Sequence, residues 1–196
     1  MDHDLDDPVL AELSRTVPVP RLEPSGDVFH DLAGCLLEQQ HPMRSTKGTY
    51  RRLLGHAGLD RLTPAEADRF SEVALPTIRL SGRKLDAFAG VADWFRENAP
   101  DWQGMTDTGA RKTLRALPGV GAWTADVILL WTLGREDILP VDDYHFKKAM
   151  AARYGIAEGA GQTRAMREIA EGWRPHRSLG VRTLLAWREW QREIAR

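Results

Sequence analysis

Cysteine is nearly absent from this sequence, which has Cys35 alone among 196 residues. One thiol cannot form an intramolecular disulfide, and it cannot supply a four-cysteine zinc site or a four-cysteine iron–sulfur cluster. The six histidines are scattered, and no two of them lie four residues apart. We therefore expect no structural metal and no cofactor.

Long apolar runs are also missing. No run reaches the roughly 18 residues that a membrane-spanning helix needs. The stretch MDHDLDDPVL is acidic where a secretory signal would be basic and then apolar. Hydrophobic residues make up 42% of the chain and charged residues 28%, a balance typical of a globular protein. The sequence therefore predicts a cytoplasmic protein that does not bind membranes.

An overall excess of positive charge is missing too, but the charges are unevenly placed. The formal net charge is −1, and four of the 28 acids lie within residues 2–7, so 24 acids face 27 basic residues elsewhere. One acid-free basic stretch covers residues 44–52, and a group of arginines covers residues 174–188. Such local patches can contact phosphates even at neutral pI. Two solvated helix faces would give the same pattern.

Sheet-forming patterns are absent as well, because no stretch alternates apolar and polar residues and no Asn-Gly pair occurs. Helical spacing recurs along the chain instead, and residues 177–194 predict a long closing helix. We expect an all-α fold of about ten helices joined by short loops. The spacing predicts three apolar helix faces: Phe29, Leu32, Ala33 and Leu36; Leu85, Phe88, Ala89 and Ala92; and Val127, Leu130 and Trp131.

Two helix starts and one connector are visible in the sequence. Thr63 predicts an N-cap, with Pro64 at the first helical position and Glu66 closing a capping box. Ser81 predicts a second cap. Three prolines within Val17–Gly26 indicate an extended connector.

The stretch LPGVGAWTADVILL, residues 117–130, is the most informative one. It predicts a helix, a tight turn through Gly119, Val120 and Gly121, and a second helix. Glycines lack a Cβ and allow close approach of the backbone, and the first amides of a helix bind anions. This hairpin is suited to binding a DNA phosphate, a contact that does not depend on the base sequence. An ordinary tight turn between two helices would look the same.

Two adjacent acids, Asp142 and Asp143, follow about twenty residues later in LPVDDYHFKKAM. Capping a helix takes one acid, so the second could be either a solvated carboxylate or a catalytic one. Hairpin, helix, LPVDD and helix in this order resemble the helix-hairpin-helix DNA glycosylases with a Gly/Pro loop and a catalytic Asp (HhH-GPD). The chain is most similar to their bacterial 3-methyladenine DNA glycosylase branch. The stretches LLEQQHPMRSTKGTY, SGRK and GWRPHRSLGVRTLLAW carry further similarity.

The resemblance implies a catalytic role for Asp143, the second acid of the pair. Its charge would stabilise an oxocarbenium ion at the anomeric carbon of a flipped nucleotide and help to orient or deprotonate water. A helix N-terminus would keep such a carboxylate ionised. Asp142 would then be a cap or a neighbour of the catalytic group. Arg177 matches the closing motif, either as a link to the active-site helix or as a DNA contact.

Position 123 separates branches of this superfamily. Glycosylases that also cut the strand have an amine nucleophile two residues after the second hairpin glycine, where this chain has Trp123. We therefore expect a monofunctional enzyme without AP lyase activity. An indole also stacks on a cationic alkylated base, although Trp123 could equally pack within the hairpin. The branch's second pocket aromatic is Val127 here, so Tyr144 and Trp187 are candidates for the remaining ring surface.

The resemblance also implies a DNA-binding set. The hairpin would bind a phosphate, and the paired-Gln turn would enter the minor groove, where Pro42 or Met43 fills the gap left by the flipped base. A polar helix end broken by a proline is the alternative for this turn. The predicted DNA-binding residues are Gly119, Val120, Gly121, Thr124, Gln39, Gln40, Pro42, Met43 and Arg44.

The implied architecture has two helical lobes with the active-site cleft between them. Residues 24–132 would form a central helical barrel that includes the hairpin, and residues 1–23 with 133–196 the lobe that carries Asp143. The implied activity is excision of alkylated bases such as 3-methyladenine and 7-methylguanine from double-stranded DNA, by a nucleoid-associated monomer. A glycosylase for deaminated or exocyclic-adduct bases, or a non-catalytic DNA-binding protein, are the alternatives.

Overall fold

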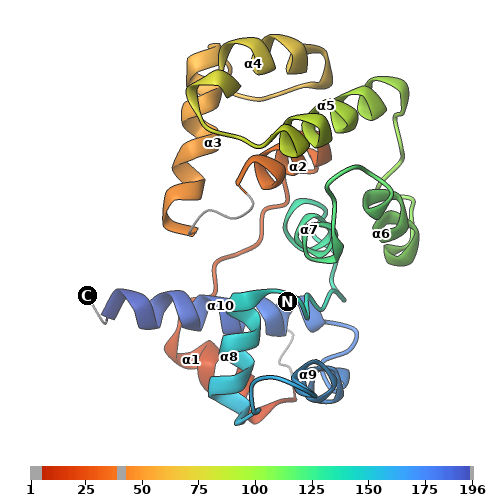
Figure 1. The fold of residues 1–196 in the computed structure, drawn as a ribbon. Helices are drawn as coiled ribbons and strands as arrows, with labels where there is room; N and C mark the ends of the chain where they lie inside the picture. Colours follow the sequence, from red (N-terminus) through yellow and green to blue (C-terminus); the bar gives the residue numbers. More distant parts are fainter. Residues whose placement is uncertain (1–5, 39–42, 195–196) are drawn as a thin grey trace. The chain divides into compact units, whose positions relative to one another are not determined.

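The computed structural model describes residues 6–38 and 43–194, and only the backbone of residues 43–47. Within these ranges it contains ten α-helices and no β-strand, which confirms the predicted all-α fold (Figure 1). None of the described helices is both long and apolar enough to cross a bilayer. The described residues cluster into two compact units, one from 25–128 and the other from 1–24 together with 129–196.

The first unit, 25–128, contains the six helices α2 to α7. α2 packs against α3 and α5, α3 packs against α4, and α6 packs against α7 (Figure 1). Short 3-10 turns at Pro64–Glu66 and Leu75–Thr77 flank α4. The helices are α2 (Val28–Glu38), α3 (Met43–Ala57), α4 (Ala67–Val73), α5 (Gly82–Glu97), α6 (Asp107–Arg115) and α7 (Ala122–Val127).

Aromatic side chains fill the core of this unit. Tyr50 lies edge-on to Phe70 at 6.2 Å between ring centroids, and Phe70 lies 5.8 Å from Phe88. His30 Nδ1 accepts the backbone N–H of Leu62 at 3.1 Å and lies 3.3 Å from the Tyr50 hydroxyl. Gly34 is required beneath Tyr50, because a Cβ there would lie 2.9 Å from the ring. These contacts join α2, α3, α4 and α5 around one hydrophobic centre.

The second unit contains α1 (Pro8–Thr16), α8 (Tyr144–Tyr154), α9 (Gln162–Glu171) and α10 (Arg177–Ile194). α10 packs against α1, α8 and α9 (Figure 1). Its bounds are those predicted for the closing helix.

Asp7 fastens α1 to the rest of this unit. Its carboxylate caps α1 by accepting the backbone N–H groups of Val9 and Leu10. It also accepts the Tyr154 hydroxyl and the Trp173 indole N–H, each at 2.9 Å. Burial and the hydrogen bond to Asp7 raise the pKa of Tyr154. Asp7, which in the sequence is only one of several acids in an acidic stretch, therefore holds α1 against the rest of this unit.

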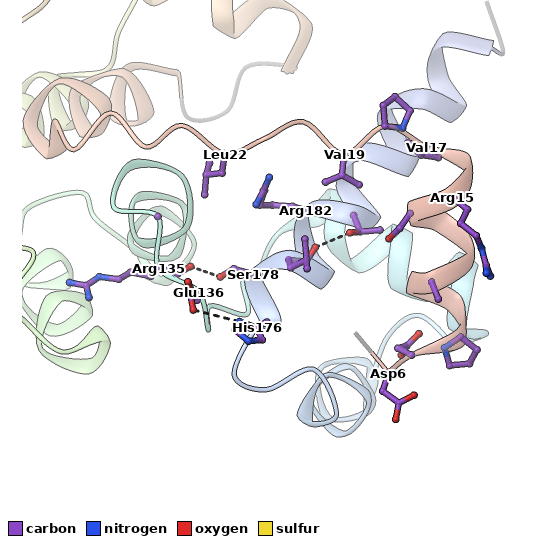
Figure 2. A pocket seen from close by; sticks show the side chains of 18 of the residues that line it. Asp6, Arg15, Val17, Val19, Leu22, Arg135, Glu136, His176, Ser178 and Arg182 are labelled. Atoms are coloured by element: carbon purple, nitrogen blue, oxygen red, sulfur yellow. Dashed lines mark hydrogen bonds and ion pairs between the residues drawn. The ribbon is translucent and has the colours of Figure 1, made fainter. Parts of the chain in front are cut away.

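The connector Val17–Gly26 is extended, as predicted, and its first part roofs a cavity of about 1270 Å³ (Figure 2). α1, the start of α10 and residues 134–136 form the walls. Arg182 donates to the carbonyl oxygen of Pro20 and so ties the connector to α10. Burial lowers the pKa of this guanidinium. Asp143 does not line the cavity.

Two of the predicted helix faces are wrong in register. In α5 the buried face runs through Ala87, Phe88, Val91 and Ala92, whereas Leu85 is 40% exposed. The apolar arc is thus centred about one residue away from the predicted face.

In the other case the helix itself changes. α7 ends at Val127, and Ile128–Thr132 continues as a π-helix. The wider turn of a π-helix breaks the 3.6-residue period. Leu130 is buried, but Trp131 is 40% exposed instead of packing beside it.

The predicted helix starts are found where expected. The Thr63–Glu66 capping box is present, and Thr63 leads into the 3-10 turn that precedes α4. Ser81 is the N-cap residue of α5, although its side chain makes no capping hydrogen bond.

Candidate active site

The hairpin between α6 and α7 has the geometry that its glycines predict, but each glycine is needed for a different reason. Gly119 adopts φ +75°, and a Cβ there would lie 2.8 Å from Ala87 Cβ and 3.2 Å from Leu36 Cδ2. Gly121 has an ordinary φ of −87°, and no atom lies within 4 Å of its virtual Cβ. Gly119 therefore seats the turn on α2 and α5, whereas Gly121 leaves open space at the start of α7.

A charged pair locks the two hairpin helices together. Asp126 of α7 is 7% exposed, and its Oδ1 accepts Nε and Nη2 of Arg111 of α6 at 2.8 and 2.7 Å. Such a two-donor contact is directional and strong. Neither residue stands out in the sequence, although their 15-residue spacing across a hairpin is visible there.

The side chains of the hairpin turn and of α7 divide between the core and the surface. Val120 and Thr124 are buried, with exposed fractions of 7% and 2%. A DNA contact at either position would therefore use the backbone. Trp123 is half-buried, so part of its indole reaches the surface of this unit.

A smaller cavity of about 470 Å³ lies beside the hairpin in the same unit. Gly119 and Pro118 form one side, and Ser81 and Lys84 from the start of α5 form another. Burial lowers the pKa of Lys84. The SGRK stretch thus lies next to the hairpin.

Asp143 begins α8 in the second unit. It is half-buried, and its Oδ1 accepts the backbone N–H of Phe146 at 2.8 Å. The carboxylate therefore lies against the positive end of an 11-residue helix. Asp143 is thus the cap, and the interpretation of Asp142 as the cap is wrong.

Asp142 is exposed and lies at the surface. Its Oδ1 is 3.9 Å from Lys147 Nζ, and its side chain is 54% exposed. The two acids of the pair therefore differ in environment, since Asp143 is held by the helix end and Asp142 by a surface lysine.

The loop that leads to Asp143 is fastened to the start of α10. Arg177 donates through Nε and Nη2 to the two carboxylate oxygens of Asp137, at 2.5 and 2.9 Å, and through Nη2 to the Asp137 carbonyl at 2.8 Å. Ser178 donates to the Arg135 carbonyl and accepts the Ile138 N–H. Arg177 thus links the start of α10 to the loop that precedes α8, and a DNA contact by Arg177 stays a prediction.

The two aromatic residues of this unit that were predicted to line the base pocket, Tyr144 and Trp187, differ in exposure. Tyr144 follows Asp143 directly and is 60% exposed. Trp187 of α10 is 9% exposed, and the Arg153 guanidinium lies 5.3 Å from its ring centroid. Of the two, Tyr144 is therefore the one open to a base.

His145 and two arginines of α10 form a cluster that the sequence analysis missed. His145 Nδ1 lies 3.3 Å from Arg188 Nε and 3.0 Å from Arg192 Nη2. Burial, Arg192 and Arg188 lower the pKa of His145, and the charge of Asp143 opposes them. Their spacing on α10, four residues apart, was the available sign of a shared partner.

Some predicted site residues cannot be placed. Gln39, Gln40 and Pro42 lie outside the described residues, and only the backbone of Met43 and Arg44 is described, in the first turn of α3. Among the described residues, no group of three His, Cys, Asp or Glu side chains could hold a metal ion. Trp123 belongs to the unit of residues 25–128, and Asp143 belongs to the other unit.

Comparison with known proteins supports the resemblance read from the sequence. No family model matches the chain. It is 40% identical over 84 residues to the probable bifunctional transcriptional activator/DNA repair enzyme AlkA of Mycobacterium tuberculosis. That match covers 43% of this chain and only 15% of the relative, so the chain spans a small part of that protein.

Solved structures match over nearly the whole chain. A DNA-3-methyladenine glycosidase from Bacillus halodurans matches with a TM-score of 0.78 at 24% identity, covering 95% of this chain and 87% of its own. Schizosaccharomyces pombe 3-methyladenine DNA glycosylase Mag1, in complex with abasic DNA, matches with a TM-score of 0.75 at 18% identity, covering 90% and 87%. The chain therefore has the fold of the helix-hairpin-helix DNA glycosylases, as predicted. Within that class it resembles the 3-methyladenine DNA glycosylases, in sequence as well as in fold.

Proposed function

We propose that this protein is a monofunctional DNA glycosylase that excises alkylated bases of the 3-methyladenine and 7-methylguanine type in base excision repair. The observation that carries the proposal is the position of Asp143, half-buried at the N-terminus of α8 in a fold shared with 3-methyladenine DNA glycosylases. The proposal extends to its partner, double-stranded DNA with damaged bases. It also extends to a monomeric state and a nucleoid-associated, cytoplasmic location.

Asp143 supplies a fixed negative charge in the proposed reaction. The bond between the anomeric carbon and the base nitrogen breaks, the base leaves with the bonding electrons, and positive charge develops on the sugar. Asp143 stabilises that charge, and it orients or accepts a proton from the water that attacks the anomeric carbon. Its hydrogen bond from the Phe146 N–H holds one carboxylate oxygen in place. Attack of water on the anomeric carbon leaves an abasic site as the DNA product.

Selection of the base rests on leaving-group ability and stacking. An alkylated purine carries positive charge, so it leaves readily and unstacks at a lower cost than a normal base. Trp123 and Tyr144 expose ring surface at the starts of α7 and α8. We assign Trp123 to stacking on the flipped base, with Tyr144 as a second wall and Trp187 as buried support.

DNA is held mainly by its backbone in this proposal. The start of α7 at Gly121 offers amides to a phosphate, with no side chain in the way. The Gln39–Arg44 segment enters the minor groove, with Pro42 or Met43 in the gap.

The test is timed release of bases from methylated DNA by wild type and Asp143→Asn. Asn caps a helix about as well as Asp, so α8 is retained while the charge is lost. We expect release to fall by at least roughly 100-fold, the scale of one positioned catalytic group. Asp142→Asn is the matched control, since the same change at the exposed neighbour should leave the rate within about threefold.

Two other functions give different results in the same assay. A glycosylase for deaminated or exocyclic-adduct bases would release those bases from a panel of lesion duplexes and leave methylated bases in place. A non-catalytic DNA-binding protein would release none of them.

A further inference from the structure

Arg188 and Arg192 are charged groups without an acidic partner among the described residues. Three other cations of the same unit are paired with carboxylates: Lys148 with Glu158, Arg153 with Glu12, and Arg177 with Asp137. Arg188 and Arg192 instead share a single neutral acceptor, His145 Nδ1. One nitrogen lone pair does not offset two positive charges that lie one helical turn apart.

The histidine fixes how this cluster is arranged. Since two N–H donors converge on Nδ1, the ring proton of neutral His145 is on Nε2. The cluster therefore presents two guanidinium groups and one imidazole N–H, all of which are donors and none of which is an acceptor. Such a set is complementary to an anion with several oxygens.

The cluster also lies beside the proposed catalytic residue. His145 is two residues after Asp143 on α8, and the charge of Asp143 acts on its pKa. The intervening residue, Tyr144, is 60% exposed. A half-buried arginine and an exposed one are thus anchored next to the surface where the damaged nucleotide would lie.

We propose that Arg188, Arg192 and His145 form a binding site for backbone phosphate of the DNA strand that carries the damaged base. The proposal rests on the proposed glycosylase function for the identity of the strand. A phosphodiester supplies the negative charge that the two arginines lack, and its oxygens accept the guanidinium N–H groups. The site would hold the strand next to Asp143 while the base is out of the stack.

The experiment measures binding to a short duplex with an abasic-site analogue at salt concentrations from about 50 to 200 mM, the range over which phosphate contacts lose affinity. Arg188→Ala/Arg192→Ala should weaken binding roughly tenfold at low salt and lower the slope of log affinity against log salt by about 1–2, at about 0.9 for each lost phosphate contact. Arg164→Ala/Arg167→Ala on α9 is the matched control, because it removes the same charge from exposed positions. That control should keep the wild-type slope.

A structural role is separated from a binding role by a conservative variant. Arg188→Lys/Arg192→Lys keeps both charges and should recover most of the salt slope. If it leaves the slope as low as in the alanine variant, charge contact with phosphate is not the cause, and the proposal is overturned. The proposal is equally overturned if the α10 and α9 alanine variants have the same slope.

Failure of this inference can be told apart from failure of the proposed function. Wild-type base release with equal slopes for the α10 and α9 variants rejects the phosphate site alone. A reduced slope only in the α10 variant, with no base released by wild type, supports the phosphate site and rejects the glycosylase activity.

Discussion

At the scale of the residue, Asp143 shows both what the sequence could predict and what it could not. Its place after a Pro-containing loop and before a helix-like run was enough to identify a helix start. Which of two adjacent acids caps that helix depends on the backbone angle at one residue. The structure gives Asp143 extended angles and a bond to Phe146 N–H, so the proposed catalytic group is also the cap.

His145, Arg188 and Arg192 show a different limit at this scale. His145 lies more than forty residues before both arginines along the chain, and the three side chains come together only because α8 packs against α10. The four-residue spacing of Arg188 and Arg192 indicates a shared partner, but no local spacing identifies His145 as that partner.

Replacing Trp123 by Ala tests the stacking assignment. Loss of an indole face against a cationic base costs about 0.5–2 kcal/mol, so release of alkylated bases should fall by about 2- to 30-fold. Affinity for undamaged duplex, which keeps its bases stacked, should change less. Parallel assays of release and of undamaged-DNA binding check this, and equal losses in both would mean that Trp123 only packs the hairpin.

At the scale of the element, the closing helix and the hairpin were predicted well because their determinants are local. Helix α10 has the predicted bounds, and Gly119 and Gly121 form the turn. The predictions of which helix faces are buried were less accurate. Leu85 in α5 and Trp131 in the π-helix are exposed because neighbouring helices, and a local change of helix period, decide which side faces the core.

The two hairpin glycines give a matched pair of substitutions. Gly119→Ala should destabilise the protein by about 1–3 kcal/mol, the usual cost of a strained backbone position, because φ is positive and the new Cβ would meet Ala87. Gly121→Ala should change stability by less than about 0.5 kcal/mol but weaken DNA binding by blocking approach to the α7 amides. Thermal unfolding and duplex-binding measurements on both variants check this, and a Gly121→Ala protein with unchanged DNA affinity would argue against phosphate binding there.

Arg177 gives the second prediction for an element, the loop before α8. Arg177→Ala removes a two-pronged contact to Asp137 and should cost about 1–3 kcal/mol, with slower base release because the loop leading to Asp143 is loosened. Arg174→Ala is the control, since Arg174 also contacts Asp137 but its side chain is 47% exposed; it should destabilise the protein less than Arg177→Ala does. Denaturant unfolding with base-release rates measures both. Equal costs would show that Arg177 is not the principal anchor.

At the scale of the whole molecule, the class of the fold could be predicted because hairpin, helix and acid occur in a fixed order along the chain. The contacts in the structure group residues 25–128 as one unit. Three points stay predictions: a cleft between the two lobes, the lesion range and the monomeric state.

The absence of an amine two residues after Gly121 predicts the product of the whole reaction. With Trp123 at that position, water is the attacking group and an intact strand with an abasic site is left. Borohydride should therefore trap no covalent adduct between the protein and lesion-containing DNA. A trapped adduct would show that one of the lysines acts as a nucleophile.

The catalytic role of Asp143 is tested most directly by single-turnover release of 3-methyladenine and 7-methylguanine from methylated DNA, with enzyme in excess. The proteins compared are wild type, Asp143→Asn and Asp142→Asn. Wild type and Asp142→Asn should release both bases rapidly, whereas Asp143→Asn should release them at least roughly 100-fold more slowly and still bind DNA. Release by Asp143→Asn at the wild-type rate would contradict the catalytic role of Asp143.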